Sequence, residues 1–396
     1  MFKKLFFASL CLLSINFQAN AVTDSSIMLC GHEKNPFIYA SLNYGIYWFA
    51  DIDHLPYCTK NKNDPQFFNA NKPHTLIFVH GWLPYSVHQH KRFSFNAEDI
   101  SGPKVTDMIA PWLKGTSGDK KPWNMGVFYW NQFSDEYPNK TDTHSWMQAV
   151  NNAESKIWSA HDVVNMRWRD AQDHLILFNA GRNQTVPDLF YENYTAALKN
   201  YSGDIRLVGA SLGTQIVIAT AKHIDDAVQS GILAKNLLPK QIVLLDPVIT
   251  NIHNSAHMKA LLADLLQLEK DGVVISGYRT SILGDTLLHT DDNTDLLKYT
   301  AFSQIDPCTY SIFSFMSRHT AGIWWYFLSY NLTHVPIVGE PRQSAPFANL
   351  PDNQLKALMS PTAPAFKSDT HNACQSDALD REWPTWQMKR VNKKEM

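Results

Sequence analysis

The chain has 396 residues, of which 44% are hydrophobic and 18% are charged, an ordinary composition for a globular protein. This composition excludes an intrinsically disordered chain, a coiled coil and a collagen. Lys and Arg number 35 against 37 Asp and Glu, so there is no excess positive charge for binding a nucleic-acid backbone, and we expect no nucleic-acid partner.

The first 21 residues have the pattern of a secretory signal peptide. Lys3 and Lys4 precede an apolar run over 5–17, and the small residues Ala19 and Ala21 fit a cleavage site. The run is too short to cross a bilayer, and no later run reaches the roughly 18 apolar residues of a transmembrane helix. We therefore expect cleavage after Ala21 and a mature protein that is secreted or periplasmic, without a transmembrane segment.

Four cysteines remain once Cys11 is removed with the signal. An even number in an exported chain favours two disulfides, for which three connectivities exist. No pair has the C-x-x-C spacing of a zinc or redox site, and we expect no metal. We predict the pairs that close the shorter loops: Cys30 with Cys58, and Cys308 with Cys374.

Five short apolar runs, rich in β-branched and aromatic residues, predict buried strands. They cover residues 75–79, 127–130, 205–208, 242–245 and 273–275. Segments with helical spacing lie between them, notably over 212–228 and 257–269. The alternation of strand and helix predicts an α/β fold, with a mostly parallel central sheet and helices on both faces.

Two regions depart from this alternation. Residues 153–184, between the second and third strands, are longer than a crossover needs and are interpreted as an insertion. Residues 336–396 are rich in Pro, Ser and Asn and have few strand signals, so we expect an extension packed on the same domain. The catalytic domain is then predicted over 22–335. The basic residues near the end of the chain are interpreted as a solvated tail.

The third predicted strand runs directly into Gly209-Ala210-Ser211-Leu212-Gly213, and a predicted helix follows. A Ser between small residues in a strand-turn-helix is the pattern of a nucleophile elbow, in which the hydroxyl is exposed at the carboxyl edge of the sheet. The helix amino terminus beside it favours a developing negative charge. Ser211 is therefore the candidate nucleophile.

The first predicted strand ends in His80-Gly81-Trp82. In such sites a loop after an early strand brings a backbone N–H against the oxyanion, and Gly permits the close approach. We predict that the N–H groups of Trp82 and Leu212 form the oxyanion hole.

Together these motifs resemble the pancreatic-lipase type of α/β-hydrolase, a family of secreted serine lipases. The resemblance covers roughly residues 70–330 and includes Leu245-Asp246-Pro247 and a His before an aromatic helical stretch, His319 followed by 324–328. It implies the α/β-hydrolase fold, with Asp246 as the triad acid and His319 as the base. It also implies a lid over about 285–308.

The residues alone leave the acid and the base open. A Ser hydroxyl needs a base within hydrogen-bond reach, and the imidazole needs a carboxylate on its other nitrogen. Asp285, just after the last predicted strand, is the rival acid because many α/β-hydrolases place it there. The rival bases are His289, His334 and His371.

The chain also departs from the family. Ala210 stands before the nucleophile, where the family usually has His, and the chain has no room for the β-sandwich domain of many members. A colipase-type partner is therefore not expected. The aromatic stretch 324–328 could touch lipid, but we expect it to be a buried helix.

We therefore predict a serine hydrolase that cleaves carboxylic esters of lipids through an acyl-enzyme, without a cofactor. A triacylglycerol lipase, a phospholipase A1 and a short-chain esterase all remain open, and the substrate could be met at a lipid–water interface. The alternative is a non-catalytic lipid- or ligand-binding protein on a hydrolase scaffold.

Overall fold

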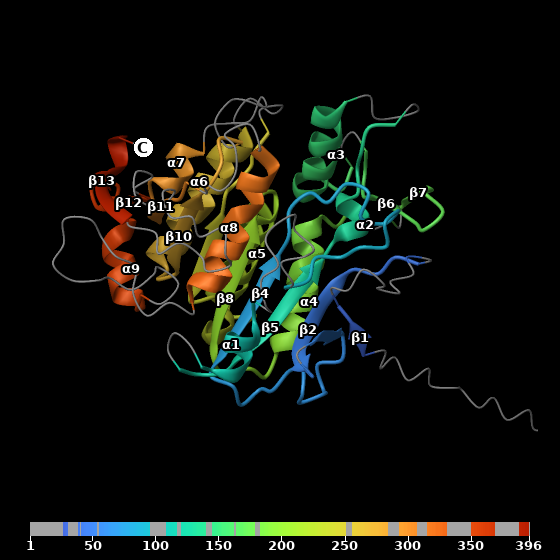
Figure 1. Ribbon diagram of the computed structural model, residues 1–396, viewed down its shortest axis with the longest axis horizontal. Coiled ribbons are helices and arrows are strands. Elements are labelled where there is room, and N and C mark those ends of the chain that lie inside the picture. Colours follow the sequence, from blue (N-terminus) through green and yellow to red (C-terminus); the bar gives the residue numbers. More distant parts are fainter. Residues whose placement is uncertain are drawn as a thin grey trace, which may run out of the picture.

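The structure is a computed structural model, and it describes residues 27–30, 39, 41–53, 55–95, 108–116, 120–139, 145–161, 164–178, 183–250, 256–283, 293–306, 315–330, 350–368 and 388–395. It is a mixed α/β structure in which one large sheet lies between layers of helices (Figure 1). No described helix is both long and apolar enough to cross a membrane.

The large sheet is mostly parallel. Its described strands lie in the spatial order β1 (Met28–Leu29), β3 (Leu55–Thr59), β2 (Gly45–Ile52), β5 (Trp123–Tyr129), β4 (His74–Val79), β8 (Asp204–Ala210), β9 (Gln241–Leu245), β10 (Val274–Arg279), β11 (Ala301–Gln304), β12 (Pro364–Ser368) and β13 (Met388–Asn392). The strands from β5 to β12 run parallel, whereas β1, β3, β2 and β13 pair antiparallel with their neighbours. The predicted α/β class is confirmed, and all five predicted strands are present as β4, β5, β8, β9 and β10.

The order of the strands reverses between β4 and β8. From β4 the chain leads to β5 on one side, and from β8 it leads to β9 on the other side. The loops that leave the carboxyl ends of β4 and β8 therefore diverge. In open parallel sheets such a switch point leaves a crevice in which ligands bind.

Helices cover both faces of the large sheet (Figure 1). The described helices are α1 (Ala110–Lys114), α2 (Asn131–Ser134), α3 (Trp146–Trp158), α4 (Val186–Leu198), α5 (Gly213–Gln229), α6 (Ala256–Lys270), α7 (Thr294–Leu297), α8 (Phe315–Ser329) and α9 (Asp352–Met359), with 3₁₀ turns η2 (Lys235–Leu237) and η5 (Lys393–Glu395). Trp123 and Phe128 of β5 are an odd number of residues apart, so they point to opposite faces. Trp123 packs on Trp112 of α1 and Phe128 on Phe190 of α4, which places these helices on opposite sides.

Helix α8 packs on the same face as α1. The ring of Phe327 lies 5.8 Å from that of Trp112, and the indole N–H of Trp112 donates to the Phe327 carbonyl at 3.1 Å. The aromatic residues of the stretch, 324–327, are all buried. The expectation that this stretch forms a buried helix is confirmed.

The C-terminal part of the chain extends the sheet. Strand β12 pairs in parallel with β11, and β13 pairs with β12, although few strand signals were found here. The basic end is not wholly a solvated tail, because Lys393 is only 2% exposed. Its ammonium donates to carbonyl oxygens at 2.7–3.2 Å, those of Lys298, Thr300, Leu358, Met359 and Ser360.

The regions interpreted as an insertion and a lid are described in part. Residues 153–184 contain the end of α3 and the small antiparallel sheet of β6 (Arg167–Arg169) and β7 (Leu175–Leu177). Within 285–308 the described part, 293–306, contains α7 and the sheet strand β11. Residues 285–292 and 307–308 lie outside the described residues. The domain boundaries stay predictions.

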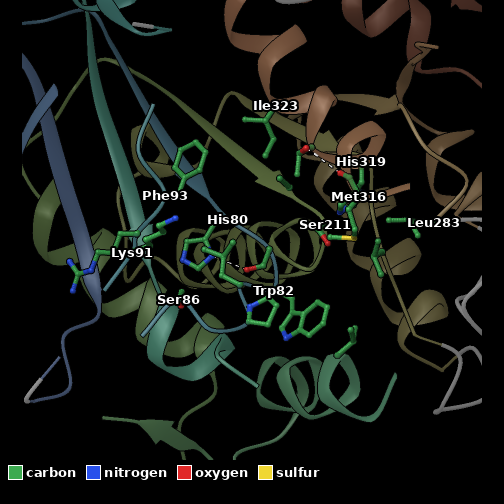
Figure 2. Close-up of a pocket in the computed structure, with 18 of the residues that line it drawn as sticks. His80, Trp82, Ser86, Lys91, Phe93, Ser211, Leu283, Met316, His319 and Ile323 are labelled. Carbon is green, nitrogen blue, oxygen red and sulfur yellow. Dashed lines mark hydrogen bonds between the residues drawn. The ribbon is translucent and has the colours of Figure 1, made fainter. Parts of the chain in front are cut away.

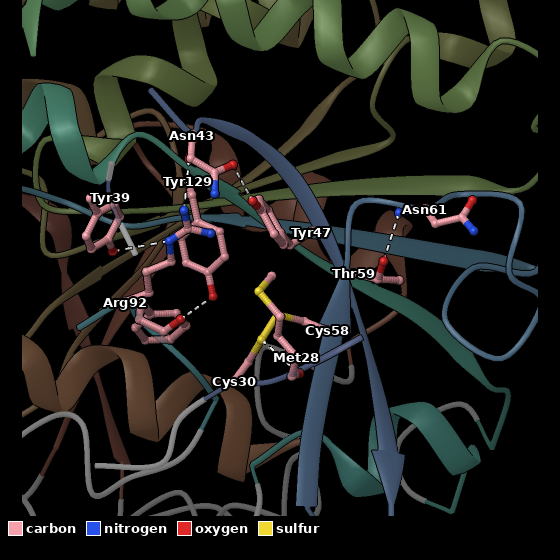
Figure 3. The surroundings of a disulfide bond; sticks show 11 residues. Met28, Cys30, Tyr39, Asn43, Tyr47, Cys58, Thr59, Asn61, Arg92 and Tyr129 are labelled. Atoms are coloured by element: carbon pink, nitrogen blue, oxygen red, sulfur yellow. Dashed lines mark hydrogen bonds between the residues drawn. A yellow bond between two sulfur atoms is a disulfide. The ribbon is translucent and has the colours of Figure 1, made fainter. Parts of the chain in front are cut away.

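A disulfide joins Cys30 and Cys58, whose Cα atoms are 5.8 Å apart (Figure 3). It links the residue after β1 to the neighbouring strand β3, and both cysteines are buried. This is one of the two predicted pairs. Cys308 and Cys374 lie outside the described residues.

Candidate active site

Ser211 lies in a sharp turn between β8 and α5. Its φ is 56°, in the left-handed region, which costs a residue other than Gly about 1–3 kcal/mol. The turn is held on both sides: the Ser211 N–H donates to Leu245 O at 3.0 Å, and its carbonyl accepts the N–H of Thr214 at 3.1 Å. The surrounding backbone thus keeps the serine in a strained conformation at the carboxyl end of the sheet.

Two glycines allow the chain to pack closely around this turn. A Cβ on Gly213 would lie 2.2 Å from the carbonyl oxygen of Val79, the last residue of β4. A Cβ on Gly81 would lie 2.5 Å from the Cβ of Ser211. The elbow and the loop after β4 therefore touch each other through positions where no side chain fits.

Asp246 and His319 are in contact. A carboxylate oxygen of Asp246, Oδ2, lies 2.6 Å from Nδ1 of His319. Asp246 is 1% exposed, and its other oxygen accepts the N–H groups of Thr280 at 2.8 Å and Ser281 at 3.1 Å. The Ser281 hydroxyl donates to Oδ2 as well. The contact expected between Asp246 and His319 is present, and the carboxylate is fixed in direction by four donors.

The contact with Asp246 determines the orientation of the His319 ring and which of its nitrogens carries the proton. Because the carboxylate is an acceptor, Nδ1 of His319 carries the proton and Nε2 holds a lone pair on the opposite side of the ring. His319 and Ser211 line the same pocket (Figure 2). No hydrogen bond joins their side chains in the described part of the chain, and such bonds are often long without a ligand.

The loop after β4 is held by His80. Burial lowers the pKa of His80 to about 4, so the ring is neutral, and its Nδ1 lies 2.8 Å from Gly81 O. The N–H of Trp130 donates to Nε2 at 3.4 Å, which leaves the proton on Nδ1. A trans peptide points its C=O and N–H in opposite directions, so fixing the Gly81 carbonyl also fixes the N–H of Trp82.

The backbone N–H groups of Trp82 and Leu212 are the predicted oxyanion donors. Within the described ranges, the backbone N–H groups of Trp82 and Leu212 donate to no other residue. The indole of Trp82 is anchored separately, by a 2.7 Å hydrogen bond to Glu136 O. Leu212 follows Ser211 in the chain, and Gly81, the residue before Trp82, packs against Ser211. Their role as oxyanion donors stays a prediction.

The pocket has a volume of about 350 Å³. Besides Ser211 and His319, its lining includes the apolar side chains of Leu83, Phe93, Met147, Val150, Val248, Leu283, Met316 and Ile323. This volume and composition suit a ligand with an aliphatic part.

Two features of the site were not predicted. The buried carboxylate of Glu154 on α3 accepts from Gln215 Nε2 at 2.5 Å and from the Thr250 N–H at 3.0 Å. It therefore ties α3 to α5 and to the loop after Asp246. The second feature is the polar end of the pocket, at Ser86, Gln89, Lys91 and Arg92. Neither feature lies in a sequence motif. The loop after β4 is rich in turns, so it has no periodicity from which the direction of its side chains could be predicted.

Asp285, His289, His334 and His371 all lie outside the described residues.

No protein-family model and no curated protein matches the chain. Among solved structures, the chain is similar to a lipase-esterase related protein from Clostridium acetobutylicum ATCC 824. The sequence identity is 15%, the match covers 60% of this chain and 75% of that chain, and the TM-score is 0.18. With so low a TM-score the likeness does not bear on the function, which is inferred from the residues themselves.

Proposed function

We propose that this protein is an exported serine hydrolase of the α/β-hydrolase type, resembling the pancreatic-lipase family, that cleaves carboxylic esters of lipids. Ser211 is the nucleophile, His319 the base and Asp246 the residue that orients the base. The N–H groups of Trp82 and Leu212 bind the oxyanion.

In the proposed mechanism Ser211 Oγ attacks the carbonyl carbon of the ester, and Nε2 of His319 takes the hydroxyl proton. The tetrahedral intermediate collapses to an acyl-serine when the alkoxide leaves with that proton. Water then attacks the acyl-enzyme in the same way, which releases the acid and returns the proton to Ser211. Asp246 keeps Nδ1 protonated, and the two backbone N–H groups stabilise the oxyanion.

One observation carries this proposal. The 2.6 Å contact between Asp246 and His319 turns the basic nitrogen of the imidazole away from the carboxylate, and the same histidine lines a pocket with a strained serine. Three elements far apart in the chain supply these groups at one sheet edge. The apolar lining of the pocket supports a lipid ester as substrate.

Labelling with a fluorophosphonate tests the proposal, because the reagent phosphonylates an activated serine. The wild-type protein should be labelled on Ser211 and should hydrolyse 4-nitrophenyl octanoate. The Ser211→Ala variant should lose labelling and about three to six orders of magnitude of turnover. Ser202→Ala, in an exposed turn before β8, is the matched control and should behave like wild type. An unlabelled, inactive wild-type protein would instead favour a non-catalytic binding protein.

Export is proposed from the amino-terminal sequence. Expression of the full chain should yield a mature protein that begins at Val22 outside the cytoplasm, measured by intact mass and amino-terminal sequencing. Retention of residues 1–21 on the cytoplasmic protein would contradict it.

A further inference from the structure

One end of the pocket differs in character from the rest. Ser86, Gln89, Lys91 and Arg92 line it, all from the loop that follows β4. In Figure 2, Ser86 and Lys91 lie on the far side of His80 and Trp82 from Ser211. Polar and charged side chains are therefore present at the end of the pocket away from Ser211, together with the apolar ring of Phe93 (Figure 2).

The charges of this end have one sign. Lys91 and Arg92 are cationic, and no Asp or Glu of the described chain lines the pocket. Lys91 is exposed, and its ammonium makes no hydrogen bond or ion pair with the described residues. Asp135 accepts the Val87 N–H at 2.9 Å from behind the loop but does not line the pocket. A ligand in this end therefore meets a positive potential, strengthened by the buried walls.

Arg92 holds the loop in place. Its guanidinium is buried, donates to Tyr39 Oη at 3.2 Å and to Asn43 O at 3.0 Å, and lies 4.7 Å from the ring centre of Tyr47 (Figure 3). The backbone of Lys91 is fixed beside it, because its N–H donates to Ser86 O at 2.8 Å. The positive end is thus built in advance of binding, which lowers the entropic cost of holding a ligand.

A hydrogen-bond donor is also available there. Ser86 is 6% exposed, and its hydroxyl oxygen has no partner among the described residues. Buried hydroxyls almost always have a partner, so a vacant one that lines a pocket points to a ligand or solvent group. A hydroxyl and an ammonium that line the same end of a pocket suit an anionic oxygen, since charge-assisted hydrogen bonds are the stronger kind.

We propose that the pocket selects esters whose far end carries an anionic group, a carboxylate or a phosphate, bound by Lys91 and Ser86. This inference rests on the proposed ester hydrolysis. The apolar part of the substrate lies beside Ser211 and His319, and its anionic group lies at the end formed by the loop after β4. An anionic acyl terminus and an anionic lipid headgroup share this chemistry.

Two pairs of substrates distinguish the two sources. For the acyl terminus, 4-nitrophenyl octanoate is compared with the 4-nitrophenyl monoester of octanedioic acid. For the headgroup, diacylglycerol is compared with phosphatidic acid of the same acyl chains in mixed micelles. The wild-type kcat/KM should favour the anionic member of at least one pair. That preference should shrink from about 0.01 M to about 1 M salt, because the Debye length falls from about 30 Å to about 3 Å.

Single substitutions test which residues cause the preference for anionic esters. Lys91→Gln should reduce the anionic-to-neutral ratio of kcat/KM about twofold to fivefold, as expected for one partly exposed charge. Ser86→Ala should reduce it in the same direction. Lys235→Gln, an exposed lysine in η2 just before the amino end of β9, removes the same charge elsewhere and should leave the ratio unchanged. The inference is wrong, while the proposed function stands, if the neutral esters are hydrolysed but the anionic-to-neutral ratio of kcat/KM is one or less. The same conclusion holds if that ratio changes neither in Lys91→Gln nor with salt.

A binding measurement separates failure of the inference from failure of the proposed function. Calorimetry compares octanoate with 1-octanol in the wild-type, Lys91→Gln and Lys235→Gln proteins. Tighter binding of octanoate that depends on Lys91 supports the anionic end even if no ester is hydrolysed. Equal binding of both ligands, or dependence on Lys235 instead, overturns it.

Discussion

Replacing Asp246 by Asn tests the proposed site most sharply, because it changes charge and proton position with almost no change in shape. In the structure Asp246 accepts the Nδ1 proton of His319. The amide of Asn can keep its oxygen on the N–H groups of Thr280 and Ser281, which then turns its NH₂ toward the imidazole. The imidazole must in response carry its proton on Nε2, where the base is needed.

The size of the effect follows from this tautomer. A base that presents N–H to the serine instead of a lone pair should lower kcat by about four orders of magnitude, about 5.4 kcal/mol in activation free energy. The fold should lose far less, since only the hydrogen bonds at Oδ2 are rearranged, at about 1 kcal/mol each. The substitution should therefore raise the activation free energy by several kcal/mol more than it lowers the free energy of unfolding.

The assay is kcat on 4-nitrophenyl octanoate, with urea unfolding monitored by circular dichroism on the same preparations. Asp285→Asn is the matched variant, because Asp285 is the rival acid; it should change kcat by less than about tenfold. A reversed ranking of the two variants, or an Asp246→Asn protein within tenfold of wild type, would refute the assignment of Asp246.

Three further predictions concern the scaffold. Gly213→Ala should destabilise the protein by about 3 kcal/mol or more in urea unfolding, because the new Cβ would lie 2.2 Å from a backbone oxygen of β4. Gly231→Ala, which has open space but φ of 73°, should cost only about 1–2 kcal/mol, and equal losses would contradict the packing argument. For His80, burial lowers the pKa from 6.5 to about 4, so between these values the unfolded chain binds a proton that the folded protein excludes. The contribution of neutral His80 to the free energy of unfolding is therefore complete above about pH 6.5 and falls by about 3 kcal/mol as the pH is lowered to 4. In His80→Gln the free energy of unfolding, measured by urea titration, should lack this pH dependence. The same pH dependence in the variant and the wild type would refute the role of His80. Lys393→Met should cost about 2 kcal/mol because it leaves buried carbonyls without their donor, whereas exposed Lys394→Met should stay within about 0.5 kcal/mol of wild type. Equal thermal unfolding of the two lysine variants would show that the carbonyl contacts contribute nothing.

The central strands could be predicted because they are buried on both faces. The run 242–245 has no polar residue, and the run 75–79 has only Thr75, which is buried; a parallel strand covered on both faces accepts such a pattern. Strands β12 and β13 were missed because their residues also occur in loops. Strand β12 begins with Pro364, which is tolerated as the first residue of a strand, and the edge strand β13 carries Lys389 and Arg390, which an exposed edge tolerates.

The proximity of Ser211 and Asp246 could be expected because short motifs mark the ends of two neighbouring predicted strands, whereas the pairing of Asp246 with His319 was implied only by the family resemblance. Parallel strands bring their carboxyl ends to one edge, so a residue after β8 and one after β9 must be neighbours. The buried position of Lys393 could not be predicted in this way. Its five carbonyl partners come from segments whose meeting depends on tertiary packing, and a run of basic residues looks the same in a solvated tail.

The position of His319, the proposed base, relative to Ser211, the proposed nucleophile, depends on helix α8 as well as on the loops. Phe327 of α8 packs on Phe78 of β4, with ring centres 5.8 Å apart, and Tyr326 accepts a hydrogen bond from Arg206 of β8 at 2.9 Å. The helix that carries His319 is therefore anchored to the same two strands whose carboxyl ends lead into the loop with Trp82 and into Ser211. Because Phe78, Tyr326 and Phe327 are buried in a close-packed layer, a shift of the helix would also disturb the packing on the sheet. This explains why an aromatic stretch follows His319: its side chains fix the position of the imidazole relative to the serine through the sheet itself.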